Sequence, residues 1–152
     1  MSQPTGAQAQ DSILVAAFYV RGTLCALDAT AVQEVMRLGR LTPVYHAMPE
    51  VLGVINMRGR IVTILDLGLR LGFGKAAPGE ESRVFIVEDR NEFIGLLVDS
   101  VAEVVEVERR SLEPTPSNMT SGCSRFYKGV FRNGGRVTTL LDVDQVLTDG
   151  TQ

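Results

Sequence analysis

The acidic side chains of this chain of 152 residues are not spaced so that they set up an acid–base reaction. Asp28, Asp66 and Asp142 are the carboxylates that a small hydrolase would use, yet no two of them are spaced as a general acid and its base. We expect Asp66 and Asp142 to cap two short helices, because a carboxylate accepts hydrogen bonds from the free N–H groups of a first turn. The sequence therefore predicts no catalytic residue.

Metal and thiol chemistry are also poorly represented. The single histidine, His46, has no second histidine, cysteine or carboxylate at the spacing of metal ligands. Cys25 falls in an apolar run and Cys123 in a polar loop, so we expect two reduced thiols rather than a disulfide. No Gly-rich phosphate loop is present. We expect neither a metal nor a cofactor.

Binding chemistry is better represented, at the tip of a predicted hairpin. The stretch GVINMRGRIVTILDL (53–67) aligns without a gap with GVFRNGGRVTTLLDV (129–143), and the second copy contains Asn133-Gly134, a strong signal for a type I′ turn. The first copy has Met57-Arg58 at those positions, followed by Gly59. Either the turn is shifted so that Gly59 takes the left-handed position, or a non-glycine residue takes it at a cost of roughly 1 kcal/mol or more. In both cases Arg58 lies at a loop tip, where its guanidinium can bind a carboxylate in a bidentate manner.

The elements that position these residues are short strands joined by turns. Apolar, β-branched and aromatic runs bounded by Gly, Asn and Asp predict hairpins, and prolines predict loops. We expect strands at 13–20, 23–27, 34–38, 51–57, 60–65, 83–88, 92–98, 101–107, 126–132 and 136–141, a helical turn at 29–32, helices from Asp66 and Asp142, and long loops at 39–50 and 108–124.

The chain is an internal duplication. Val32–Val35 matches Val101–Val104 at an offset of 69, and the later match has an offset of 76, so the second copy carries seven more residues (76 − 69), which the 108–124 loop can hold. Two such small halves gain stability by packing on each other. We therefore predict a mainly β fold of two five-stranded barrels related by a pseudo-twofold axis. Residues 12–150 would form one domain with halves at about 12–74 and 82–150, after a disordered tail at 1–11.

Charge and composition exclude other classes of protein. The net charge of −3 and the absence of Trp count against a nucleic-acid-binding barrel. No apolar run approaches the roughly 18 residues of a membrane helix. The first residues have neither the basic nor the apolar segment of a signal peptide, so we expect a cytoplasmic protein.

Several motifs together resemble one family. Gly53–Val62 followed by Asp66-Leu67 resembles the signature of CheW-like domains, the adaptors of bacterial chemosensory arrays. Phe18–Val20 and the Val32–Val35 segment are similar to the opening strands of that family, as are Gly95–Val101 and Tyr127–Val130 to its central segment and last hairpin. The resemblance covers about residues 12–147. Thr63 is a departure, since many members have proline there.

The resemblance implies a fold, a function and partners. The fold would be two intertwined five-stranded SH3-like β-barrels with short helices. The function would be that of a non-catalytic adaptor in signal transduction, coupling the cytoplasmic tip of chemoreceptors (methyl-accepting chemotaxis proteins) to the regulatory domain of a CheA-type histidine kinase. The protein would be cytoplasmic and recruited to membrane-associated receptor arrays.

The resemblance also implies which residues bind. The receptor would contact a groove formed by or beside Val32, Glu34, Gly53, Asn56, Arg58 and Gly59. We also expect Asn56 to orient the Arg58 loop through local backbone hydrogen bonds. For the kinase-facing surface the apolar residues Met36, Leu38, Leu41 and Val44 are candidates, either as an exposed anchor patch or as part of the barrel core.

Some alternatives stay open at this point. The same scaffold would serve a related pathway that controls type IV pili or a second messenger, while a nucleic-acid-binding barrel and a small hydrolase fit the residues less well. Glu103 is the counterpart of Glu34 in the repeat, and we expect it to be a solvated strand residue.

Overall fold

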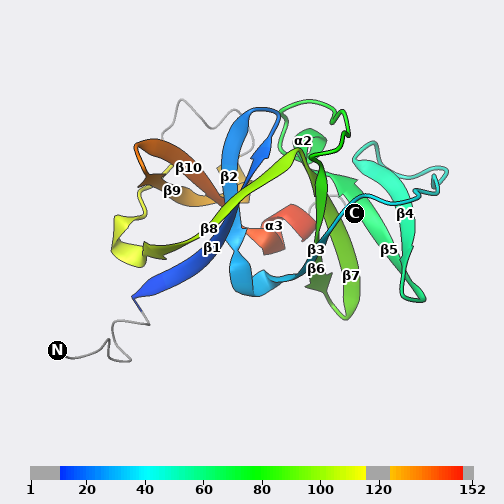
Figure 1. Cartoon of the computed structure of the whole chain (residues 1–152), viewed down its shortest axis with the longest axis horizontal. Coiled ribbons are helices and arrows are strands. Elements are labelled where there is room, and N and C mark those ends of the chain that lie inside the picture. The colour runs from blue at the N-terminus through cyan, green and yellow to red at the C-terminus, as the bar shows by residue number, and fades with distance from the viewer. Residues whose placement is uncertain (1–10, 116–123, 149–152) are drawn as a thin grey trace.

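The computed structural model describes residues 11–115 and 124–148. Nearly all of the regular structure is β, and the helices are short (Figure 1). Residues 1–10 of the predicted tail at 1–11 and part of the predicted loop at 108–124, including Cys123, lie outside the described residues. The strands are β1 (Ser12–Val20), β2 (Thr23–Asp28), β3 (Val32–Met36), β4 (Val51–Met57), β5 (Arg60–Asp66), β6 (Arg83–Asp89), β7 (Glu92–Val98), β8 (Ser100–Glu108), β9 (Tyr127–Asn133) and β10 (Arg136–Leu141). The helices are η1 (Ala29–Ala31), α2 (Leu67–Arg70), η2 (Arg109–Ser111), η4 (Ser124–Phe126) and α3 (Val143–Thr148).

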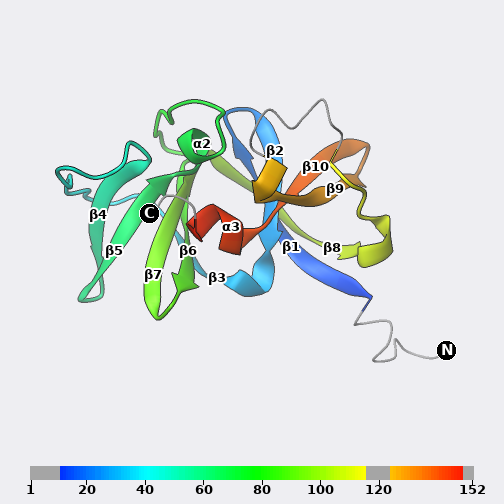
Figure 2. The same cartoon turned by 180° about the vertical axis from the view of Figure 1, so that it is seen from behind.

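The strands form two five-stranded sheets with the same plan. One has the order β8-β1-β2-β10-β9, here called the first barrel, and the other β3-β6-β7-β5-β4, the second barrel. Exchanging each strand for the one five positions away in the chain converts the first order into the second, and the parallel pair β2–β10 matches the parallel pair β5–β7. The internal duplication and the intertwined arrangement are thereby confirmed. Neither half forms a barrel by itself, because each barrel contains strands from both halves (Figures 1 and 2).

Both sheets are closed by the segment that follows one edge strand. After β3, Thr42 exchanges two backbone hydrogen bonds of 2.8 Å with Val54 on β4, the opposite edge. After β8, Glu113 does the same with Val130 on β9. Closure removes free edges on which other chains would pair.

Two glycines make this closure sterically possible. Gly53 and Gly129 have φ values of +152° and +155°, which side chains rarely adopt. A Cβ on Gly53 would lie 2.4 Å from the Thr42 carbonyl oxygen, and one on Gly129 would lie 2.7 Å from that of Glu113. Gly53 therefore has a structural role that follows from its missing side chain.

The core has three parts because strand residues alternate between two faces. On β1, Val15 and Ala17 pack inside the first barrel, whereas Phe18 and Val20 face the other way, into a cluster shared by the two barrels. In this shared cluster the Phe18 ring meets that of Phe85 edge-on, with ring centroids 5.1 Å apart. The two barrels are thus joined through one continuous apolar core.

The predicted caps are confirmed. Asp66 is fully buried, and its carboxylate accepts from Leu69 N at 3.2 Å and from Ala76 N at 2.8 Å. Asp142 accepts from Gln145 N at 3.3 Å. Asp28 accepts from Thr30 N at 2.9 Å at the start of η1. The carboxylates of the hydrolase alternative are therefore used to fix the backbone.

The register of the duplicated turn differs from the prediction by one residue. The left-handed pair is Gly134 (φ 63°) and Gly135 (φ 83°), and Asn133 ends β9, so the prediction of a central Asn133-Gly134 pair is wrong. In the first copy the pair is Arg58 (φ 51°) and Gly59 (φ 85°). Both alternatives predicted for this turn are therefore found at once. Gly59 takes a left-handed position, and Arg58 takes one as well, which costs a residue with a side chain about 1 kcal/mol or more.

Two further features bear on the class of protein. Cys25 is a buried free thiol, and its burial raises the thiol pKa to about 12. Within residues 11–115 and 124–148, the helices are too short and too polar to cross a bilayer.

Candidate functional site

The Arg58 turn forms an ion pair with an edge strand of the same barrel. Arg58 lies between β4 and β5, and Glu34 lies on β3 at the opposite edge of the sheet. Barrel closure brings them together: Arg58 Nη2 is 2.5 Å from Glu34 Oε1, and Nη1 donates to Oε2 at 3.3 Å. The guanidinium therefore holds the carboxylate with both of its terminal nitrogens.

The pair shifts the titration of both groups while remaining open to solvent. The hydrogen bond from Arg58, and then its charge, lower the pKa of Glu34 although partial desolvation acts in the opposite direction. The hydrogen bond to Glu34, and then its charge, raise the pKa of Arg58. The side chain of Arg58 is 69% exposed and that of Glu34 is 34% exposed, so solvent screening keeps the contribution of the pair to stability small. Both side chains are accessible to a partner.

Asn56 orients the turn, as predicted. Its Oδ1 accepts a hydrogen bond of 2.9 Å from Gly59 N, three residues along the chain. Met57, the last residue of β4, is buried in the second barrel. The turn is therefore fixed at its base by packing and within its loop by a side-chain hydrogen bond, and the Arg58 side chain at its tip is 69% exposed beside Glu34.

The structure brings four of the six predicted receptor-facing residues together. Glu34, Asn56, Arg58 and Gly59 form one hydrogen-bonded group. Val32 lies on the same strand as Glu34, half-buried against the shared core. Gly53 lies apart from the group, at the barrel closure.

The pseudo-twofold equivalent of the ion pair is a weaker contact. Glu103 on β8 accepts a hydrogen bond of 2.8 Å from Asn133 Nδ2, the last residue of β9. Glu103 is an exposed residue of β8, as expected, and its hydrogen bond to Asn133 also joins the two edges of a barrel. Only the first copy has an arginine at this position of the turn.

Exposed valines lie on the edge strands β3 and β8. Val35 on β3 is 45% exposed, and its repeat counterpart Val104 on β8 is 58% exposed. Val101 on β8 and Leu14 on the neighbouring β1 are exposed as well. Figure 1 shows both edge strands on one face of the molecule. We did not predict these residues as a site. The sequence match between Val32–Val35 and Val101–Val104 was the signal that could have pointed to the valines of the two edge strands.

Most of the apolar residues considered for the kinase-facing surface lie in the barrel. Met36, Leu38 and Leu41 are half-buried and pack against the core of the second barrel, as the core alternative predicted. Val44 is 44% exposed. Next to it, Tyr45 at 85% and Met48 at 40% are also exposed, and sequence reasoning missed both. The exposed apolar patch is therefore Val44, Tyr45 and Met48, here called the 44–48 patch.

The part of the chain that the structure describes has no cluster of metal-ligating side chains. No three His, Cys, Asp or Glu side chains there are grouped so that they could hold an ion. The site combines an exposed ion pair with exposed apolar side chains.

Comparison with known proteins agrees with this geometry. Residues 15–150 match the family model described as "CheW-like domain". The "Chemotaxis protein CheW" of Rhizobium meliloti is 34% identical over 130 residues, covering 86% of this chain and 84% of the relative. The protein of the same name from Thermotoga maritima is 28% identical over 147 residues, covering 97% of this chain and 95% of that one.

A solved structure has the same fold. The structure titled "Crystal structure of scaffolding protein TtCheW from Thermoanaerobacter tengcongensis" superposes with a TM-score of 0.81 at 27% sequence identity, covering 92% of this chain and 91% of that chain. With a family model matching nearly the whole chain and a relative above 30% identity over most of it, the chain belongs to the family of CheW-like domains.

Proposed function

We propose that this protein is a non-catalytic adaptor that couples chemoreceptors to a CheA-type histidine kinase in bacterial chemosensory signal transduction. Membership of the CheW-like family and the chemotaxis proteins among its relatives support this function. The observation that carries it is the solvent-exposed Arg58–Glu34 pair at the edge of the second barrel, because it presents a charged group fixed for recognition but placed for no reaction.

The receptor-facing surface would be the group of Glu34, Asn56, Arg58 and Gly59 with Val32 beside it. The partner would be the helical hairpin at the cytoplasmic tip of a chemoreceptor. An apolar side chain of that helix would pack on the exposed valines of β3 and β8, while its polar groups meet the ion pair. Gly53 would contribute through the position of β4.

The kinase-facing surface would be the 44–48 patch. Val44, Tyr45 and Met48 are adjacent, apolar and exposed, and Tyr is among the residues that most often anchor an interface. Leu41 and the residues before it would support this loop from inside the barrel. The two surfaces together would recruit the adaptor from the cytoplasm to membrane-associated receptor arrays, where many weak contacts act together.

Co-sedimentation tests this proposal. Membranes that carry chemoreceptors of the same cell are mixed with the kinase, with and without this protein, and then centrifuged. We expect the kinase to sediment with the membranes to a greater extent when the protein is present. A kinase that sediments equally in both cases, with the protein left in the supernatant, contradicts the proposal.

A further inference from the structure

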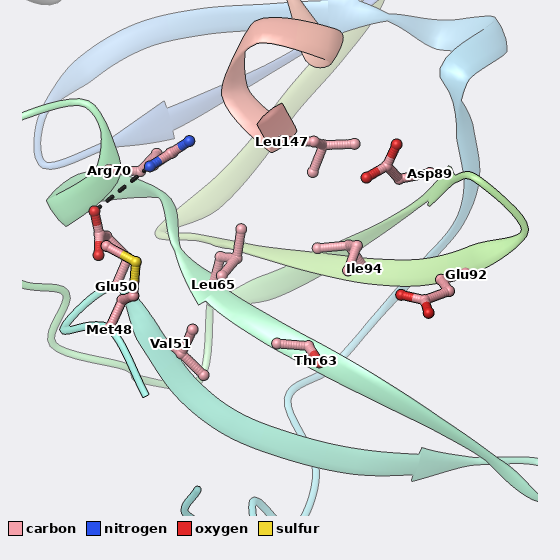
Figure 3. A pocket seen from close by; sticks show the side chains of 10 residues that line it. All are labelled: Met48, Glu50, Val51, Thr63, Leu65, Arg70, Asp89, Glu92, Ile94 and Leu147. Carbon is pink, nitrogen blue, oxygen red and sulfur yellow. Dashed lines mark ion pairs between the residues drawn. The ribbon is translucent and has the colours of Figure 1, made fainter. Parts of the chain in front are cut away.

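A pocket of about 240 Å³ lies where the shared core of the two barrels reaches the surface beside α3. Figure 3 shows the side chains of Leu65 on β5 and Ile94 on β7 along its middle, with Leu147 of α3 on one side. The two strands are neighbours in a parallel pair, so their outward side chains form a continuous apolar wall. The pocket thus has room for one long side chain against this wall.

One end of the pocket is formed by the ion pair of Arg70 and Glu50, and one atom of each of these side chains has no hydrogen-bond partner among the described residues. The Arg70 side chain is only 6% exposed, and its Nη1 is 3.5 Å from Glu50 Oε2. Its Nε donates to the Val146 carbonyl oxygen at 2.8 Å, and its guanidinium carbon lies 5.3 Å from the centre of the Phe126 ring. Arg70 Nη2 and Glu50 Oε1 are buried without a hydrogen-bond partner among the described residues. Such unpaired groups are uncommon and destabilising, so this end has not been optimised for stability alone.

The internal duplication shows how the equivalent position in the second copy is filled. The Glu50 carbonyl oxygen accepts from Asp66 N at 2.7 Å, and the Phe126 carbonyl oxygen accepts from Asp142 N at 2.7 Å, so residues 50 and 126 are structural equivalents. Phe126 is 2% exposed and fills its position with a ring that packs in the shared core. At the first position a carboxylate stands in place of that ring, and a pocket remains. The fold itself therefore does not require this pocket to be open.

The other end of the pocket is acidic. Asp89 and Glu92, on the β6–β7 hairpin, line it on the side away from Arg70 (Figure 3). Neither carboxylate has a side-chain hydrogen bond or ion pair within residues 11–115 and 124–148. Among the charged residues that line the pocket Glu50 opposes Arg70, so Asp89 and Glu92 leave the lining with a net negative charge that favours a cation. Two arginines lie close to this end without lining it: Arg90 on the same hairpin, and Arg60, which donates to the Asn91 carbonyl oxygen at 3.4 Å.

We propose that this pocket receives a lysine or arginine side chain from a partner protein. Its methylene stem would lie on Leu65 and Ile94, and its charged head would reach Asp89 and Glu92, since long basic side chains bury their stems and keep their heads among polar groups. Because the charges of Arg70 and Glu50 oppose each other, the inner end gives the head little net attraction, and the head would stay at Asp89 and Glu92. A carboxylate or phosphate ligand would face two unpaired carboxylates, which disfavours it.

This pocket is distinct from the proposed receptor-facing surface, and it borders the 44–48 patch, because Met48 belongs to both. Figure 2 shows α3, whose Leu147 lines the pocket, at the front, whereas Figure 1 shows the edge strands β3 and β8 on the opposite face. The inference therefore adds a contact next to the 44–48 patch, and its test with free amino-acid probes does not depend on where the receptor binds.

An NMR titration of the full chain, labelled at its methyl groups, tests the inference. The probes are Nα-acetyl-arginine N-methylamide and its lysine analogue, with Nα-acetyl-glutamate N-methylamide as the control of opposite charge. We expect the basic probes to shift the methyl signals of Leu65, Ile94 and Leu147, and the shifts to decrease as salt is added. The double variant Asp89→Asn/Glu92→Gln should bind the basic probes about tenfold more weakly.

Matched variants separate this site from its neighbours. Glu88→Gln removes a charge from the same hairpin but not from the pocket, so it should titrate like the parent, and Arg58→Ala should do so as well. Equal shifts with the glutamate probe, shifts that survive the double variant, or no shift of these methyl signals would overturn the proposal. Shifts of the same signals on raising the protein concentration alone would assign the pocket to a second copy of the chain and would also overturn it.

Discussion

Glu34 and Arg58 lie 24 residues apart on opposite edges of one sheet, and their side chains are nevertheless joined by hydrogen bonds of 2.5 and 3.3 Å. Because both are exposed, this pair adds little to folding, and its main effect is to hold two flexible side chains in one arrangement. A partner that binds such a prearranged pair loses less side-chain entropy than one that must order it. A receptor carboxylate would have to share Arg58 with Glu34 or replace it.

Replacing Arg58 by alanine should weaken receptor binding without unfolding the protein. We expect at least about a tenfold loss of affinity, since charge-assisted hydrogen bonds of a bidentate arginine are lost. The melting temperature should change by no more than about 2 °C, because alanine meets the same left-handed strain and only an exposed ion pair disappears. Binding to receptor-bearing membranes and thermal unfolding measure the two effects.

Arg90→Ala is the matched control for that substitution. Arg90 is also an exposed arginine in a left-handed turn position, with φ 53°, but it lies on the β6–β7 hairpin and forms no ion pair with a carboxylate of the described residues. It should bind receptor membranes like the parent. If the two variants bound equally well, Arg58 would have no special role.

Replacing Gly53 by alanine should destabilise the fold far more than the same change at an open turn. The new Cβ would lie 2.4 Å from the Thr42 carbonyl oxygen in a backbone conformation that disfavours side chains. We expect a loss of about 2–4 kcal/mol in the free energy of unfolding, measured by chemical denaturation. Gly22→Ala, where no atom lies within 4 Å and only the left-handed φ is unfavourable, should lose about 1–2 kcal/mol. Similar losses in the two variants would show that the closure at Thr42 is not rigid.

The titration of the Glu34 carboxylate should reveal its ion pair with Arg58. Because Arg58 lowers its pKa in the folded protein, Glu34 contributes stability above the unfolded value near 4.5 and loses that contribution as the pH falls through the lower, folded pKa. An NMR titration of the side-chain carboxyl carbon should give a lower pKa in the parent than in Arg58→Ala. The same pKa in both proteins would mean that the pair is not formed in solution.

The 44–48 patch and the barrel residues before it should respond differently to truncation. Tyr45→Ala should weaken kinase binding while leaving stability unchanged, because the ring is 85% exposed. Leu41→Ala should lower the free energy of unfolding by about 1–3 kcal/mol, since Leu41 packs against the core of the second barrel. Calorimetric titration with the kinase and denaturant unfolding separate the two. A large loss of kinase affinity in Leu41→Ala with unchanged stability would reverse the assignment.

The features that depend on local chemistry were predictable from the sequence. The strands follow from their apolar runs, the helix starts at Asp66 and Asp142 from their capping groups, and the duplication from its constant offsets. The turn register was misjudged because Asn133-Gly134 and Gly134-Gly135 are both compatible with a type I′ turn, and a local pattern does not choose between them.

The features that depend on distant segments were not predictable. Glu34 meets Arg58 only because the segment around Thr42 closes the barrel, and no local signal gives that closure. The pocket at Arg70 depends on the absence of a ring at residue 50, which becomes visible only when Phe126 is seen to fill the equivalent place. The exposure of Tyr45 depends likewise on how its loop lies over the barrel.

The exchange of strands between the barrels has a mechanical consequence. The chain passes from the first barrel to the second between β2 and β3, and it returns between β7 and β8. Two covalent connections therefore join the barrels, in addition to the packing of Phe18 on Phe85. A pull exerted on one barrel is carried to the other through two short connections, η1 between β2 and β3 and Asp99 between β7 and β8, with no single hinge about which the barrels would swing. The molecule should therefore behave as a stiff spacer, and a displacement imposed by one neighbour should reach the other almost undiminished.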